Sequence, residues 1–144
     1  MKKIQKALLL ILVVVLALAI PANALEIMPR ASKYISSYYA DTFARANGDI
    51  SMSFDITGVG RVDTIGADYI YLYEVNGGSI KRVAIYDQTN TPELIATNAF
   101  DNDGTLVYTN AISGRQYYAV VKFVAGKNGG SDTRNYTTVA VTAK

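Results

Sequence analysis

The sequence contains no histidine, no cysteine and no tryptophan. Without histidine and cysteine, it has neither the base nor the thiolate of Ser-His-Asp and Cys-His nucleophilic catalysis. The usual zinc, copper and non-haem iron sites are excluded for the same reason, because their ligands are imidazole and thiolate groups. Ser-x-x-Lys and glycine-rich phosphate-loop motifs are also missing. We therefore expect a non-enzymatic protein without a cofactor or a metal.

Residues 1–24 have the pattern of a cleaved secretory signal peptide. Positive charge comes first, from Lys2, Lys3 and Lys6. The uncharged apolar run 7–20 follows, and it is shorter than the ~20 residues that a membrane span needs. Ala22 and Ala24 form an Ala-x-Ala cleavage site, so cleavage is expected after Ala24. The alternative is that the segment is retained as an N-terminal anchor.

Removal of this segment reverses the sign of the net charge. It takes away three of the 14 basic residues and none of the 12 acidic ones. The remaining chain has 11 basic and 12 acidic residues, so its net charge is −1. That balance, without a run of lysine or arginine, gives no attraction to nucleic acid. Nothing in the remaining chain is predicted to anchor it to a membrane. We expect a secreted, extracellular protein.

The absence of cysteine also leaves the remaining 120 residues without disulfides. Many small secreted domains depend on disulfides. A chain of this length is nevertheless one domain's worth, and it can bury ~65% of its unfolded surface by itself. After a short lead-in, 25–32, we therefore predict a single domain over 33–144, held by its core and its sheet.

The stretch Gly114–Ala125 is the clearest strand. One face is apolar or aromatic throughout: Tyr117, Ala119, Val121, Phe123 and Ala125. The other face is largely apolar too: Tyr118, Val120, Lys122 and Val124. A strand that is apolar on both sides is typical of the centre of a sheet, with cover on each face.

Further alternation and turn signals predict other short strands. They cover 33–40, 50–56, 68–75, 80–86, 93–96, 105–109 and 134–142. Residues 57–66 are predicted as a loop with Val62 and Ile65 beneath the sheet, Asp101–Gly104 as a turn, and Gly126–Asp132 as a flexible hairpin loop. No amphipathic helix is evident after residue 24. The pattern favours an all-β fold, an antiparallel β-sandwich of seven to eight strands.

Gly114 followed by Tyr117 resembles the entry to strand F of immunoglobulin-like and fibronectin type III sandwiches. In those folds a buried tyrosine ring fills the edge of the core, and its hydroxyl bonds to the backbone at the corner. Ser113 stands where that pattern normally has proline, so the resemblance implies the sandwich and no adhesive function.

A second resemblance covers most of residues 29–143. It is to an uncharacterised family of small secreted proteins of Gram-positive anaerobes. The shared residues are Pro29–Ser32, Ile65–Ala67, Ser113-Gly114 with Tyr117–Phe123, and Gly129–Thr138. This family has no assigned activity, so the resemblance implies a fold and a location only.

Tyrosine is the one informative excess, with 11 residues. Tyr69, Tyr71 and Tyr73 share one face of a predicted strand, ~6.6 Å apart per step. If exposed, they form an aromatic platform for a sugar or a protein, with Lys81 and Arg82 as neighbouring polar contacts. If buried, they belong to the core, which is the commoner place for large aromatic side chains in a sandwich.

Asp101 and Asp103 are the only carboxylate pair that invites a chemical interpretation. Their spacing suits a glycosidase pair at ~5–9.5 Å, and the local sequence resembles a fragment of a calcium loop. That loop lacks its first ligand, because Ala99 stands there, and its last, because Asn110 replaces the glutamate. We favour turn formation for both aspartates, and a weak calcium site remains an alternative.

The sequence therefore predicts a secreted binding or interaction module whose partner is an unknown extracellular protein or glycan. One alternative is a carbohydrate-binding module that uses the tyrosine row. Others are a self-assembling extracellular structural component and, less favoured, an enzyme that works with carboxylates and tyrosine alone.

Overall fold

The computed structural model describes residues 32–144, and it contains seven β-strands and one short 3-10 turn, Pro92–Leu94. The strands are β1 (Ile35–Ala44), β2 (Ile50–Asn76), β3 (Ser79–Asp87), β4 (Ile95–Tyr108), β5 (Gln116–Lys127), β6 (Gly130–Thr137) and β7 (Val141–Thr142). The predicted signal segment, with its cleavage site at Ala22 and Ala24, lies outside the described residues.

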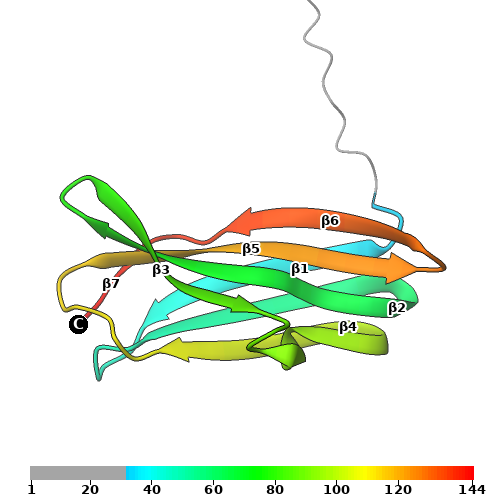
Figure 1. Ribbon diagram of the computed structural model, residues 1–144, viewed down its shortest axis with the longest axis horizontal. Helices are drawn as coiled ribbons and strands as arrows, with labels where there is room; N and C mark the ends of the chain where they lie inside the picture. The colour runs from blue at the N-terminus through cyan, green and yellow to red at the C-terminus, as the bar shows by residue number, and fades with distance from the viewer. Residues whose placement is uncertain (1–31) are drawn as a thin grey trace, which may run out of the picture. The chain divides into compact units, whose positions relative to one another are not determined.

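Every strand pairing is antiparallel, so the predicted all-β antiparallel fold is confirmed. The main hydrogen-bonded order is β1-β2-β5-β6, with β3 and β4 paired to β2 and β7 paired to β5 (Figure 1). The long strand β2 is thus the element to which four of the other six strands are bonded.

The prediction of a loop over residues 57–66 is wrong. These residues belong to β2, which is 27 residues long and runs through them without a break. Its first part, up to Thr57, pairs with β1 and β4, and its last part pairs with β3 and β5. Glycines let the strand bend without ending. At Gly66, with φ +153°, an added Cβ would lie 1.8 Å from the Leu94 carbonyl oxygen, so only glycine fits this crossing. Val62 and Ile65 are buried there, as predicted.

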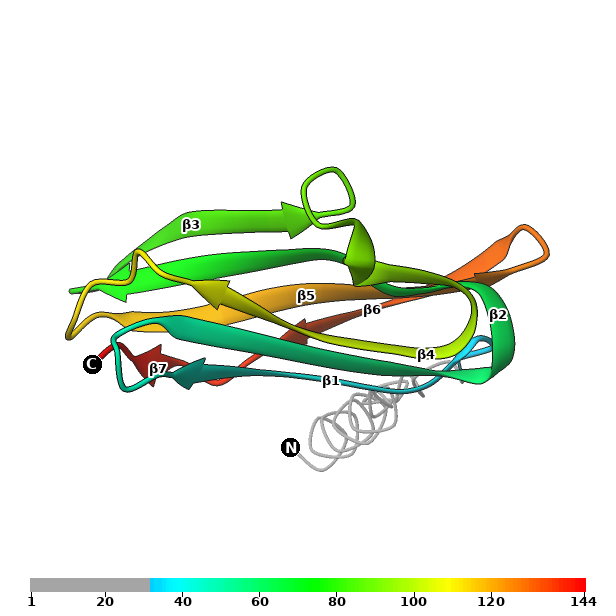
Figure 2. The ribbon, with the colours of Figure 1, turned by 90° about the horizontal axis from the view of Figure 1, so that it is seen from below.

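The bend folds the two parts of the sheet over one core (Figure 2). Contacts between strands that are not paired show this directly. The ring of Tyr38 on β1 lies 5.4 Å from that of Phe123 on β5, and Tyr108 on β4 lies 6.2 Å from Tyr117 on β5. The arrangement is sandwich-like, with the first layer made of β1, β4 and the start of β2 and the second made of β3, β5, β6 and the end of β2.

The inward residues of both layers follow the alternation read from the sequence. Ile50, Met52, Phe54 and Ile56 of β2 are at most 4% exposed, and the five apolar residues of β5 from Tyr117 to Ala125 are at most 1% exposed. The strand β5 pairs with β2 on one side and with β6 and β7 on the other. Its predicted central position is therefore confirmed.

The predicted turn at Asp101–Gly104 is wrong, because these residues lie inside β4 and pair with β2. Gly104 stands opposite Phe54, and a Cβ there would come within 2.7 Å of the Phe54 ring. Asn102 points inward and its side-chain amide donates to the Leu94 carbonyl at 2.8 Å. The glycine and the asparagine thus serve packing and hydrogen bonding rather than a change of chain direction.

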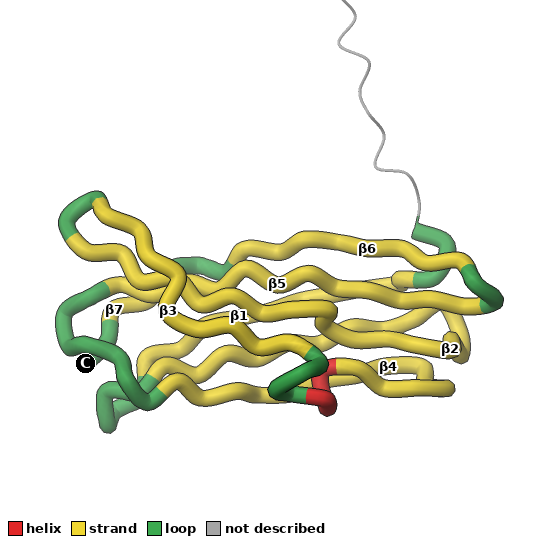
Figure 3. Tube along the Cα trace, in the orientation of Figure 1, coloured by secondary structure: helices red, strands yellow, loops and turns green. Residues whose placement is uncertain are grey.

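The remaining connections range from two-residue turns to the longer loops 88–94 and 109–115 (Figure 3). The predicted seven-residue loop Gly126–Asp132 is wrong, because Lys127 pairs with Gly130 and leaves only Asn128 and Gly129 between the strands, both with positive φ. The predicted hairpin after 68–75 is present. Its two turn residues are Gly77 and Gly78, since Asn76 already pairs with Ser79.

Candidate interaction surface

Tyr69, Tyr71 and Tyr73 lie on the outer side of the second layer. The alternation along β2 places Ile70 and Leu72 in the core at 0% exposure, so the three tyrosines point the other way. Each is half-buried, because neighbouring side chains cover part of its ring. The cross-strand partners Tyr118 and Lys122 on β5 and Arg82 on β3 lie on the same side. We call these six residues the tyrosine face.

The tyrosine rings of this face are stacked rather than laid side by side. The Tyr69 and Tyr71 ring centroids are 4.1 Å apart with an angle of 11° between the planes, and Tyr73 and Tyr118 are 5.2 Å apart at 12°. Rings that are nearly parallel and this close must lie one over the other, so Tyr69 and Tyr71 are stacked face to face. Each of these four rings therefore has one face against its stacking partner.

Two cations complete the tyrosine face. The Arg82 guanidinium lies 4.7 Å from the Tyr71 centroid, and the Lys122 ammonium lies 5.7 Å from that of Tyr69. Both distances are within the range of cation–π attraction. Lys122 also forms a 2.9 Å salt bridge with Asp68, and this hydrogen-bonded pair raises the pKa of Lys122. Exposed apolar surface lies beside them at Ile80 and Ile85 of β3, which are 59% and 42% exposed.

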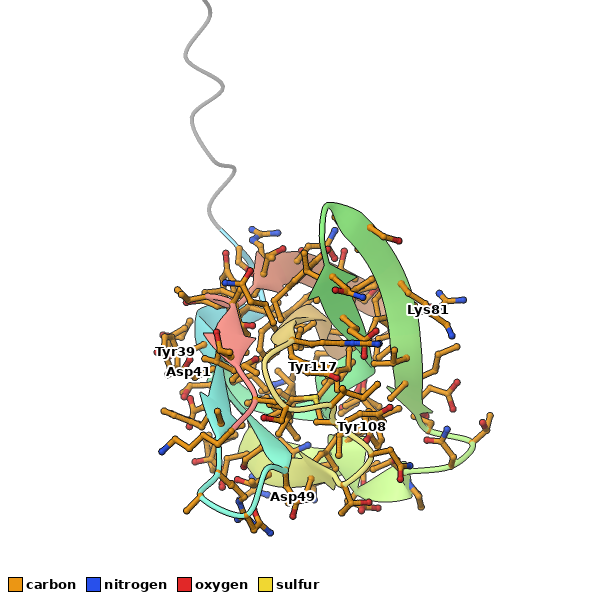
Figure 4. The ribbon with its side chains drawn as sticks, turned by 90° about the vertical axis from the view of Figure 1, so that its left-hand side faces the viewer. Tyr39, Asp41, Asp49, Lys81, Tyr108 and Tyr117 are labelled. Carbon is orange, nitrogen blue, oxygen red and sulfur yellow. The ribbon has the colours of Figure 1, made fainter. Side chains whose placement is uncertain are left out.

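The sequence prediction included Tyr69, Tyr71, Tyr73 and Arg82, and the structure brings these four together. Lys81 pairs with Glu74, whose side chain points inward, so Lys81 belongs to the opposite side of β3. Figure 4 shows Lys81 on β3 at the edge of the molecule, away from Tyr117 in the interior. Tyr118 and Lys122 were missed, because only the pairing of β2 with β5 places them beside the tyrosine row.

The outer side of the first layer carries four aspartates: Asp41 on β1, Asp55 on β2, and Asp101 and Asp103 on β4. Asp55 and Asp103 are directly opposite each other in the strand ladder, and both are exposed. Tyr39 and Phe43 lie on the same side, each 52% exposed. We call these six residues the acidic face.

The two predicted alternatives for Asp101 and Asp103, a glycosidase pair and a weak calcium site, would have to lie on an open surface. Both side chains point outward from a regular strand, without an apolar pocket around either carboxyl. Among residues 32–144, no group of three or more potential ligands of the His, Cys, Asp or Glu type is placed to hold a metal ion.

Gly114 and Tyr117 form a corner at the start of β5, and Figure 4 shows Tyr117 in the interior. Tyr117 is 0% exposed, and its hydroxyl accepts a hydrogen bond from the Ile112 backbone N–H at 2.8 Å. The same hydroxyl donates to Glu74 Oε2 at 2.7 Å, while Arg115 binds Glu74 Oε1 at 2.6 Å. Gly114 turns the chain with φ +82°.

The titration of the corner follows from these contacts. The hydrogen bond from Tyr117, supported by Arg115, lowers the pKa of Glu74 against the opposing effect of burial. Burial is the main reason that the pKa of Tyr117 is raised. The carboxylate of Glu74 is therefore held as an anion inside the sandwich, and it is a structural group rather than a candidate for catalysis.

No family model, curated protein sequence or solved structure matches this chain. Within residues 32–144, no helix has the length and apolar character to cross a membrane. The assignment of a function therefore starts from the geometry of the two outer faces.

Proposed function

We propose that this protein is a non-enzymatic interaction module that binds a protein surface through the tyrosine face. The observation that carries the proposal is the row of half-buried, stacked tyrosines with Arg82 beside it. Tyrosine and arginine are enriched at protein interfaces, because each combines a large contact area with polar groups that keep hydrogen-bonding partners. Exposed Ile80 and Ile85 extend the apolar part of the same surface.

The stacking favours a protein over a glycan as the partner. A sugar that stacks on an aromatic side chain needs a free ring face. Tyr71 has Tyr69 against one face, and the guanidinium of Arg82 therefore lies over the other. For Tyr71 the edge and the hydroxyl group remain, and these suit side-chain and backbone partners. The carbohydrate-binding alternative would require Arg82 to leave the ring of Tyr71 if the sugar is to stack on that residue.

We further propose that the protein acts outside the cell, on the strength of the signal-peptide pattern in residues 1–24. The proposed immunoglobulin-like character is supported by the buried Tyr117, whose hydroxyl bonds the backbone of Ile112 at a corner before the central strand. The resemblance to uncharacterised small secreted proteins remains a prediction that agrees with both proposals.

Retention experiments test the choice between protein and glycan. The purified protein, its Tyr71→Ala variant and the control Phe100→Ala would be passed over immobilised cell-surface protein extract and through gels containing soluble polysaccharides. Phe100 is an aromatic residue, 50% exposed, outside the tyrosine face. We expect retention by protein that Tyr71→Ala abolishes and Phe100→Ala preserves. Retardation by a polysaccharide that depends on Tyr71 would instead establish the carbohydrate-binding function.

A further inference from the structure

The two outer faces of this protein differ in charge. The outward positions of β1, β4 and the start of β2 include four aspartates and neither lysine nor arginine. Residues 32–144 carry ten basic and eleven acidic residues, a net charge of −1, so everything outside the acidic face sums to +3. The excess of negative charge is therefore concentrated on one side of one layer.

The negative charge of the acidic face is not balanced locally. Asp55 and Asp103 are direct cross-strand neighbours, an arrangement in which like charges destabilise a sheet. The two salt bridges recorded among residues 32–144, Arg115 with Glu74 and Lys122 with Asp68, lie elsewhere. Cationic and hydrogen-bond-donating groups on a partner would relieve this repulsion.

Such groups lie together on the tyrosine face. Arg82 supplies a positive charge, Lys122 supplies a second one that Asp68 partly balances at 2.9 Å, and the tyrosine hydroxyls supply donors for carboxylate oxygens. Two tyrosine faces in contact would set these cations against their own copies, and two acidic faces would oppose eight carboxylates. Only the mixed arrangement pairs opposite charges and also brings Tyr39 and Phe43 against the tyrosines.

We propose that the partner of the tyrosine face is the acidic face of a second copy of this chain. This inference rests on the proposed function, because it names the partner of the same surface. The two faces lie on opposite layers of one sandwich, so a copy that has bound through one face keeps the other free. Such a head-to-tail contact does not close on itself, and it produces open chains of copies.

The dimensions of the two faces agree. The outward rows Ser51 to Thr57 and Tyr69 to Val75 each comprise three two-residue steps, or ~20 Å at the usual strand rise. With three strands ~4.8 Å apart, each face offers about 300 Å². That is less than the ~800 Å² per partner of a standard interface, so the association is weak and salt-sensitive. It becomes substantial only at high local concentration.

Sedimentation velocity at millimolar protein, in low and high salt, tests the inference. We expect the wild type to form a concentration-dependent series of species that salt dissociates. Arg82→Glu on the tyrosine face and Asp103→Lys on the acidic face should each weaken association by at least about tenfold, because each places like charges in contact. Urea unfolding checks that each variant is folded. If Arg82→Glu does not fold, Ile85→Glu takes its place as the variant that adds negative charge beside the tyrosine face.

Mixing the two variants gives the sharpest result. The intact acidic face of Arg82→Glu can bind the intact tyrosine face of Asp103→Lys. The two faces that remain free in this complex are the mutated ones, so the complex cannot grow further. We expect a 1:1 complex in the mixture and monomers in each separate sample. A wild type that remains monomeric at millimolar concentration overturns the inference. So does a dimer that Tyr71→Ala abolishes and Asp103→Lys leaves intact.

These outcomes separate the inference from the proposed function. If the wild type is monomeric but another protein binds it in a Tyr71-dependent way, the tyrosine face is an interaction surface and the self-association is overturned. If Tyr71→Ala changes neither retention by protein nor self-association, the proposed function fails together with the inference.

Discussion

Tyr117 and Tyr73 occupy opposite sides of the same layer, although their strands are directly paired. In the ladder between β2 and β5, Tyr73 faces Tyr118 and Glu74 faces Tyr117. Tyr117 points into the core, where its hydroxyl has two hydrogen-bond partners. Tyr73 and Tyr118 point outward, are half-buried and stack on each other. A shift of one residue in register thus separates a structural tyrosine from one available for binding.

The first prediction removes one tyrosine from each side. Tyr117→Ala should lower the free energy of unfolding by about 3–5 kcal/mol, as for other large aromatic side chains deleted from a core. Tyr71→Ala on the outer side should cost about 1 kcal/mol or less, because its ring is only half-buried. Urea midpoints measure both. Equal losses for the two variants would contradict the distinction between inner and outer tyrosines.

The second prediction applies the same comparison to β4. Gly104→Ala places a methyl group 2.7 Å from the Phe54 ring, and this overpacking should cost about 1–3 kcal/mol. Thr105→Ala, the next residue and an exposed one, should change stability by about 0.5 kcal/mol or less. Thermal or urea unfolding of the pair checks this. A neutral Gly104→Ala would show that the Phe54 ring can move aside and that packing does not require glycine at this position.

The third prediction concerns the acid sensitivity of the corner. Because the pKa of Glu74 is lowered in the folded state, its stabilisation is fully present above its ordinary pKa of 4.5. It is lost as the pH falls through the lower, folded-state pKa. Glu74→Gln should cost about 1–2 kcal/mol at neutral pH, since Arg115 loses its charged partner.

The pH profile distinguishes this corner from the other carboxylates. Asp87 and Asp132 also have lowered pKa values, because they accept hydrogen bonds from Thr89 and from Ser32 respectively. The difference in stability between wild type and Glu74→Gln should therefore shrink between pH 5 and lower pH, while a residual slope remains in the variant. Parallel curves at all pH values would exclude a titrating Glu74.

Much of the inner side of the fold was predictable, because burial leaves a period-two signal. The alternation of Ile50, Met52, Phe54 and Ile56 identified an inward face, and the apolar residues from Tyr117 to Ala125 identified the central strand. The predicted loop at 57–66 and turn at 101–104 failed for a common reason. Glycine there permits close approach of Leu94 or Phe54 rather than a reversal of the chain, and local sequence does not separate these uses.

The outer surface was less predictable, since it depends on register between distant strands. The tyrosine row at 69–73 was visible in the sequence, but its neighbours Tyr118 and Lys122 lie some 50 residues away and join it only through the β2–β5 pairing. The acidic face has the same origin. Asp55 and Asp103 become neighbours because β4 pairs with the start of β2, and the four-residue turn expected at 101–104 concealed this pairing.

The last prediction has the smallest expected effect and returns to this pair. Asp103→Asn removes one of two directly opposed carboxylates, so it should stabilise the fold by a few tenths of a kcal/mol, up to about 1. Asp41→Asn, whose carboxylate accepts the Thr42 backbone N–H, is the matched control and should be neutral or destabilising. Chemical denaturation at low salt measures both. If the acidic face is a docking surface, Asp103→Asn should stabilise the monomer while weakening self-association. A variant that changes both quantities in the same direction would show that the aspartates serve folding rather than contact between copies.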